Sequence, residues 1–211
     1  MHWIAALPAA AAGAVAGVLT ARLAGRYIDG ASVPVTVAMV TLTAAGCAAM
    51  ALRFGPVPAL PAYCYLAAIA VPLAVIDTRC HRLPDALTLP SYPITLTLLS
   101  AAFPFTPGGA RCLERAVVTA AAVLALYTLL ALASRGAIGW GDVKLSGILG
   151  LYLGWTSTHA IPYGVGGGFL LAALTAIILM LTRKADRKTD LPFGPFMLAA
   201  AVLAILVASA P

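Results

Sequence analysis

Long apolar segments recur along this chain of 211 residues and restrict what it can fold into. A helix needs about 20 such residues to cross roughly 30 Å of hydrocarbon, and eight segments come close to that length. They are approximately Trp3–Leu23, Val33–Leu52, Leu60–Ile76, Ala86–Phe103, Leu113–Ala133, Val143–Thr158, Ile161–Leu181 and Phe193–Ala208. The pattern predicts an all-α, polytopic membrane helical bundle with about eight transmembrane helices, the fourth of them kinked by Pro90 and Pro93.

The composition agrees with lipid as the main solvent of this surface. Hydrophobic residues make up 62% of the chain and charged residues 9%, whereas a soluble domain carries about 25% charged residues. The net charge of +6 is scattered between apolar segments, so we expect membrane lipid and no nucleic acid as a partner. The longest polar connection, Thr182–Asp190, is too short to fold alone, so residues 1–211 are expected to form a single integral-membrane domain.

The basic residues predict the orientation of the bundle. Ten of the thirteen lie in the odd-numbered connections between segments. These ten are Arg22, Arg26, Arg79, Arg82, Arg135, Lys144, Arg183, Lys184, Arg187 and Lys188. Because positive loops stay inside, the odd-numbered connections are expected to be cytoplasmic and both termini external.

Two aspartates border the apolar segments, where a charge is costly and implies a function. Asp77 follows the third segment, and Asp142 precedes the sixth within Gly139–Leu145. Two segments separate them, so both are expected at the same, cytoplasmic, face. Two adjacent carboxyl groups do not both ionise easily, so they share a proton. Such a pair can hydrolyse peptides, the carboxylate activating water and the acid polarising the amide.

The helix ends give a hypothesis for which aspartate holds that proton. Asp77 is expected at a helix C-terminus, where the dipole opposes a negative charge, and Asp142 at a helix N-terminus, where the dipole favours one. Asp142 would then be the base and Asp77 the proton holder, unless Arg79 or Arg82 reaches Asp77.

Neighbouring residues have simpler explanations. Asp85 fits a helix N-cap, and Lys144 is expected to point away from Asp142, toward lipid phosphate or a loop acid. His81 is interpreted as an interfacial residue. Glycine pairs at four-residue spacing are expected to be helix-packing faces. The sequence contains no recognisable metal-ligand cluster and no phosphate-binding loop, so neither a metal nor another cofactor is expected. The glycine pairs are Gly13 with Gly17, Gly150 with Gly154, and Gly164 with Gly168.

Three blocks of residues together resemble the type IV prepilin peptidases, which are GxGD-type intramembrane aspartic proteases. The first runs from Ile76 and Asp77 to Leu83, Pro84 and Asp85. The second is Gly139-Trp140-Gly141-Asp142-Val143-Lys144-Leu145, and the third is Pro192-Phe193-Gly194-Pro195-Phe196. The similarity extends roughly from Leu60 to the C-terminus.

The resemblance implies an endopeptidase that removes the basic leader of prepilins or pseudopilins at the cytoplasmic face of the bacterial inner membrane. Asp77 and Asp142 match the family's catalytic pair, and no cofactor is implied. Neither the particular pilin nor the oligomeric state follows from the sequence.

One feature departs from the family pattern. Many members also N-methylate their product, using a large region between the first two spans that often carries CxxC motifs. The connection Ala24–Ser32 is short and has no cysteine. We therefore expect peptidase activity without N-methyltransferase activity. Two other classes remain as alternatives: a proton-coupled transporter or channel, whose acids would lie near mid-membrane, and a catalytically silent pilus or secretion assembly protein.

Overall fold

The structure is a computed structural model that describes residues 3–28, 32–134, 138–183 and 191–208. Within these ranges there are eight α-helices and no strand, which confirms the predicted all-α bundle. A 3-10 turn, Phe103–Phe105, follows the fourth helix. The helices are α1 (Trp3–Ala24), α2 (Val33–Phe54), α3 (Leu60–Cys80), α4 (Asp85–Ala102), α5 (Gly109–Ala133), α6 (Trp140–Thr156), α7 (Ala160–Leu181) and α8 (Gly194–Val207).

Six of the described helices, α1 to α5 and α7, are long and apolar enough to cross a membrane. The other two are shorter, since α6 has 17 residues and α8 has 14. The chain is therefore a multi-pass membrane protein whose two shortest helices are both packed against other helices.

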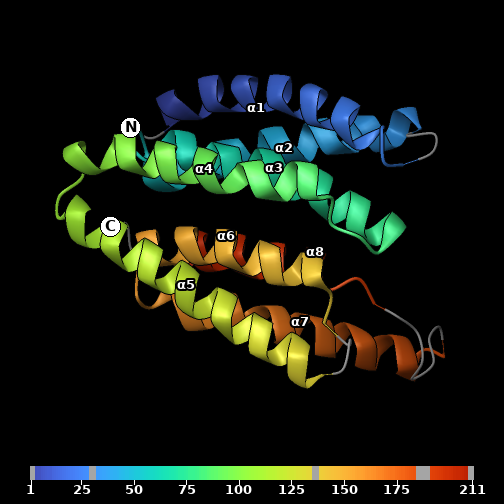
Figure 1. The fold of residues 1–211 in the computed structure, drawn as a ribbon. Coiled ribbons are helices and arrows are strands. Elements are labelled where there is room, and N and C mark those ends of the chain that lie inside the picture. The colour runs from blue at the N-terminus through green and yellow to red at the C-terminus, as the bar shows by residue number, and fades with distance from the viewer. Residues whose placement is uncertain (1–2, 29–31, 135–137, 184–190, 209–211) are drawn as a thin grey trace.

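The connections alternate between the two ends of the bundle (Figure 1). The helix ends that flank the odd-numbered connections gather at one end, and the even-numbered connections lie at the other. Asp77 in the last turn of α3 and Asp142 in the first turn of α6 therefore share one end of the molecule, as predicted. Four of the basic residues used to predict orientation lie outside the described residues, namely Arg135, Lys184, Arg187 and Lys188.

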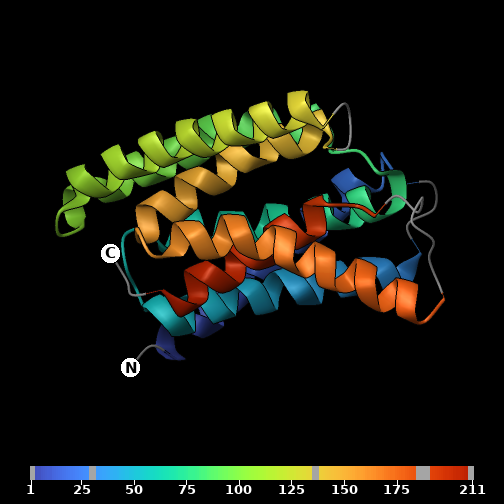
Figure 2. The ribbon, with the colours of Figure 1, turned by 90° about the horizontal axis from the view of Figure 1, so that it is seen from below.

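Helix α6 is the central element of the bundle. Every residue from Asp142 to Thr156 except Lys144 is buried. Helix α6 contacts α4, α5, α7 and α8, and Figure 2 shows it beside α7 and α8. A helix covered on all sides by protein does not need to match the full thickness of the lipid, which accounts for its shortness.

Glycines allow the closest helix contacts, as the four-residue spacings predict. A Cβ atom on Gly150 would lie 2.7 Å from the Cα of Ala120 in α5, and one on Gly154 would lie 2.7 Å from the carbonyl oxygen of Arg115. Helices that approach this closely gain van der Waals contact, which replaces the hydrophobic effect inside lipid. Similarly close contacts occur at Gly13 and Gly17 against α2 and at Gly164 against α6, and a looser one occurs at Gly168 against α8.

Two expected boundaries need correction. Helix α3 continues past Ile76 to Cys80, and α6 begins at Trp140 rather than Val143. Both shifts have one cause: the apolar signal stops at the first acid, whereas the backbone hydrogen bonding of a helix continues across the membrane interface. Pro90 and Pro93 lie inside α4, which runs through both without ending.

Candidate active site

The Asp77 side chain lies where the end of α3 meets the start of α8. Helix α3 ends because His81 adopts a left-handed conformation (φ 50°), with its N–H bonded to the Asp77 carbonyl at 2.8 Å. Asp77 is buried, with only 5% of the residue exposed. Its Oδ2 accepts a hydrogen bond from the backbone N–H of Gly194, the first residue of α8, at 3.0 Å. Asp77 therefore receives one of the free N–H groups at the start of α8.

Asp142 lies in the first turn of α6, whose N-cap is Gly139. Its backbone N–H donates a hydrogen bond to the Gly139 carbonyl at 3.0 Å, and 9% of the residue is exposed. A Cβ atom on Gly139 would lie 3.3 Å from Oδ2 of Asp142, so the carboxylate folds back over the helix start. The predicted position of Asp142 at a helix N-terminus is confirmed.

The hypothesis that gave the two aspartates different roles was incomplete. It took account only of α3, whose C-terminal dipole opposes a charge on Asp77. In the structure the N-terminus of α8 also faces this carboxylate, and a helix N-terminus favours negative charge. Within the described residues, neither Arg79 nor Arg82 forms an ion pair with Asp77. Each aspartate therefore has a helix start beside it, and the pair is better treated as one unit that shares a proton.

Both aspartates line one cavity of about 260 Å³. A space of this size accommodates water and a short stretch of extended peptide beside the two carboxyl groups. The residues that line it come from the first two of the three sequence blocks. They are Asp77, His81, Arg82, Leu83, Asp85, Gly139, Trp140, Gly141 and Asp142.

Leu83 packs between two of the motif glycines. A Cβ atom on Gly141 would lie 2.9 Å from the Cβ of Leu83, and one on Gly194 would lie 3.5 Å from its Cδ1. A Cβ atom on Gly194 would also lie 2.8 Å from Oδ2 of Asp77. Glycine at both positions is therefore a packing requirement that lets α6 and α8 approach the segment after α3.

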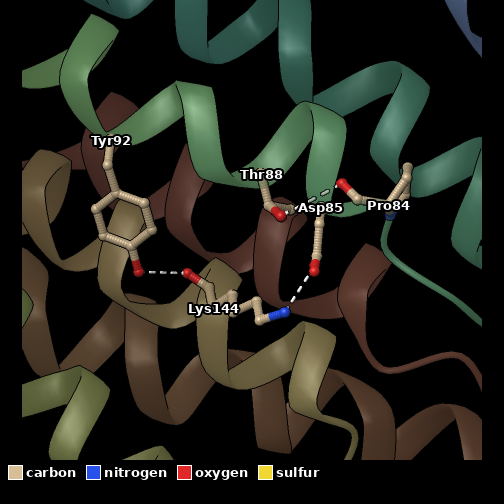
Figure 3. Close-up of polar contacts among 5 residues, drawn as sticks. All are labelled: Pro84, Asp85, Thr88, Tyr92 and Lys144. Atoms are coloured by element: carbon tan, nitrogen blue, oxygen red, sulfur yellow. Dashed lines mark hydrogen bonds and ion pairs between the residues drawn. The ribbon is translucent and has the colours of Figure 1, made fainter.

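Asp85 and Lys144 bind one another at the edge of this cavity. Lys144 Nζ lies 2.7 Å from Asp85 Oδ1, and Figure 3 shows Asp85 pointing from α4 toward Lys144 on α6. Asp85 is the first residue of α4 rather than its N-cap, which is Pro84. The carboxylate bonds an ammonium group on another helix, so the simple capping role expected for Asp85 is corrected. Of the partners expected for Lys144, an acid is the one found.

An aromatic cluster fixes the start of α8. The Phe193 ring lies 5.0 Å from that of Phe169 in α7 and 6.3 Å from that of Tyr127 in α5, measured between centroids. Tyr127 and Phe169 also stack on each other at 5.5 Å. Pro195 occupies the first turn of α8, where its missing N–H costs no intrahelical bond. Tyr127 and Phe169 were missed by the sequence argument, because an aromatic residue in an apolar segment carries no signal of its partners.

His81 and the cysteines bring no further ligands together. Among the described residues, no group of three His, Cys, Asp or Glu side chains is arranged to hold a metal ion.

Three curated relatives of this chain carry one name. The chain is 34% identical to the prepilin leader peptidase/N-methyltransferase of Aeromonas hydrophila over 171 residues, which are 78% of this chain and 56% of that protein. It is 35% identical to the protein of the same name from Dickeya chrysanthemi, over 66% of this chain and 48% of the relative. The protein of that name from Stutzerimonas stutzeri is 30% identical over 64% of this chain and 45% of its own length.

The chain thus spans about half the length of the curated relatives it matches. No solved structure matches it significantly. The model of the type IV leader peptidase family matches residues 64–209, a range that includes Asp77, Asp142 and the start of α8. This match covers more than half of the chain, and the protein belongs to the type IV leader peptidase family.

Proposed function

We propose that this protein is an intramembrane aspartic endopeptidase that removes the basic leader of prepilins or pseudopilins, with Asp77 and Asp142 as its catalytic pair. The observation that carries the proposal is the single cavity lined by both carboxyl groups, in a chain that belongs to a leader peptidase family. The relatives' printed name supports a prepilin as the substrate.

The chemistry needs one proton on the pair. The ionised carboxylate removes a proton from water, which attacks the carbonyl carbon of the scissile amide, while the neutral carboxyl group polarises the carbonyl oxygen. The proton taken from water then passes to the departing amine. Burial of both side chains supports this mechanism, because low exposure favours one shared negative charge over two.

The same pair argues against a transporter or channel. A proton relay across a membrane is expected to have acids near the middle of the bilayer. Asp77 lies in the last turn of α3 and Asp142 in the first turn of α6, so both are at helix ends.

We propose further that the catalytic end of the bundle faces the cytoplasm of a bacterial inner membrane. Arg22, Arg79 and Arg82 lie toward this end, in agreement with the positive-inside rule. A basic leader would stay on that side while the apolar helix after the cleaved bond enters the lipid. The substrate and membrane lipid are then the partners, and the mechanism uses no cofactor and no nucleic acid.

We also propose that the chain acts as a single membrane domain with peptidase activity alone. Helix α1 ends at Ala24 and α2 begins at Val33, and the connection between them has no cysteine. Mass spectrometry of the processed pilin addresses this point. A methylated N-terminus that depends on this protein would contradict it.

The test uses purified protein in liposomes with a prepilin substrate. Asp77→Asn and Asp142→Asn should each fold and fail to cleave. Glu114→Gln is the matched control, because it makes the same carboxylate-to-amide change at an exposed position near the start of α5. Normal cleavage by either aspartate variant would exclude the two-aspartate mechanism. No cleavage by the wild type, with folding intact, would favour the silent assembly protein.

A further inference from the structure

Lys144 is held by α4 through both its side chain and its backbone (Figure 3). Its ammonium group pairs with Asp85 at 2.7 Å, and its carbonyl oxygen accepts a hydrogen bond from the Tyr92 hydroxyl at 2.6 Å. Asp85 and Tyr92 lie two turns apart on α4, on the face toward α6. Two independent contacts therefore converge on one residue of α6.

The α6 surface is shaped to receive Tyr92. A Cβ atom on Gly147 would overlap the Tyr92 hydroxyl oxygen and lie 3.1 Å from the ring carbon that carries it. The phenol therefore lies directly over Gly147, and any side chain there would displace it. Glycine at this position, one turn from Lys144, makes the hydrogen bond possible.

These contacts connect the two halves of the catalytic pair. Lys144 follows Asp142 by two residues on α6, and Asp85 begins α4 after a short connection from Asp77. A shift of α4 along α6 would thus move one carboxyl group relative to the other. The ion pair is itself partly open to solvent, 35% exposed at Lys144 and 56% at Asp85. Such exposed pairs contribute little to folding, so its main effect is expected to be on geometry.

We propose that Asp85, Tyr92, Lys144 and Gly147 form an α4–α6 clamp that positions Asp142 against Asp77. The clamp rests on the function proposed above, and its members are positioning residues. None of them exchanges a proton with the substrate. Catalysis is sensitive to this kind of contact, because a displacement of about 1 Å lowers a rate by about 100-fold.

A different reading assigns Asp85 to the basic leader of the substrate, since its carboxylate also lines the cavity. The two readings differ in kinetics. A residue that binds the leader changes KM, whereas a residue that sets the geometry of the pair changes kcat. They also differ for Lys144, which a basic leader would not contact.

The kinetic test uses two single variants, Lys144→Met and Asp85→Asn. It also uses a double variant in which the charges are exchanged, Asp85→Lys combined with Lys144→Asp. Each single variant should lower kcat about 10-fold with KM changed less than about twofold, and the exchange should restore most of kcat. Gly147→Ala should lower kcat to the same extent as Lys144→Met and Asp85→Asn. Arg111→Met and Glu114→Gln, exposed and near the start of α5, are the matched controls and should leave both constants unchanged.

A second measurement does not depend on cleavage. Spin labels at Leu89 on α4 and Leu132 on α5, both exposed, report the distance between α4 and α5, the helix that packs against α6, in a cysteine-free chain. The distance distribution should be narrow in the parent, broader with Lys144→Met and narrow again in the exchanged pair. This result is obtained even if the wild type cleaves no prepilin, so failure of the clamp and failure of the proposed function remain distinguishable.

Three outcomes would overturn the clamp. The first is unchanged kcat in both single variants. The second is a rise in KM with Asp85→Asn while Lys144→Met is normal, which would assign Asp85 to the leader. The third is an unchanged distance distribution in Lys144→Met.

Discussion

The backbone N–H of Gly194 donates a hydrogen bond to the Asp77 carboxylate at 3.0 Å, across 117 positions of the chain. This contact places the start of α8 against the end of α3 and gives Asp77 the same kind of electrostatic environment that α6 gives Asp142. The segment from Pro192 to Phe196 therefore contributes to the site through a backbone group rather than a side chain. Its contribution depends on how closely the start of α8 can approach the Asp77 carboxylate.

Gly194→Ala should abolish most of the activity. The added Cβ atom would lie 2.8 Å from Oδ2 of Asp77, so the carboxylate or the helix must move, and a loss of about 100-fold in kcat is expected. The measurement is cleavage of prepilin in liposomes. Gly166→Ala is the control, because its Cβ atom would meet nothing within 4 Å. Wild-type kcat in Gly194→Ala would show that the contact is dispensable.

Phe193→Ala should reduce both stability and activity. It removes the ring that packs on Tyr127 and Phe169. Because Phe193 is only half-buried, the cost should be about 2 kcal/mol, below the 3–5 kcal/mol of a fully buried phenylalanine. Thermal unfolding in detergent and kcat measure the two effects. Phe105→Ala, at a 75% exposed site, should change neither. An unaltered unfolding temperature in Phe193→Ala would remove the anchoring role.

Gly154→Ala and Gly166→Ala should have opposite effects on stability. At Gly154 the new Cβ atom would lie 2.7 Å from the Arg115 carbonyl, which forces α5 and α6 apart at a cost of about 1–3 kcal/mol. At Gly166 there is open space, and the helix propensity of alanine should stabilise α7 by about 0.5–1 kcal/mol. Thermal unfolding checks the signs. A stabilised Gly154→Ala protein would contradict the packing described for the α5–α6 pair.

Cys80 gives a direct test of orientation. It is exposed at the catalytic end of the bundle, whereas Cys47 and Cys112 are buried. If this end is cytoplasmic, a membrane-impermeant maleimide should label Cys80 only after the cells are permeabilised. In a Cys80→Ser background, Phe105→Cys at the other end should react in intact spheroplasts. Labelling of Cys80 in intact spheroplasts would reverse the proposed topology.

Much of the architecture could be predicted from local properties of the sequence. Whether a segment such as Leu113–Ala133 forms a helix in lipid depends on its own length and composition, so the number of helices was confirmed. The shared end of Asp77 and Asp142 follows from counting the segments between them. Helix boundaries at the interface were less accurate, since α6 begins before the apolar run does.

The contact partners of the site residues could not be predicted from the sequence. Nothing near Asp77 in the sequence indicates that its carboxylate meets Gly194, and the hypothesis based on the α3 dipole alone was incomplete for that reason. Lys144 had an acid among its expected partners, but which acid could not be derived from spacing. No pattern in the sequence predicts the aromatic contacts of Phe193.

The sequence by itself determined a bundle of about eight helices, the end at which its two aspartates lie and the family that the motifs resemble. Only the tertiary structure decided that α8 presents its first N–H to Asp77, that Asp85 pairs with Lys144, and that α6 is enclosed on all sides. The physical reason is that helix formation in lipid is governed by each segment's own hydrogen bonds and hydropathy. Contacts between helix ends depend instead on how closely the packed helices approach, and here glycines at positions 141, 147 and 194 set those distances.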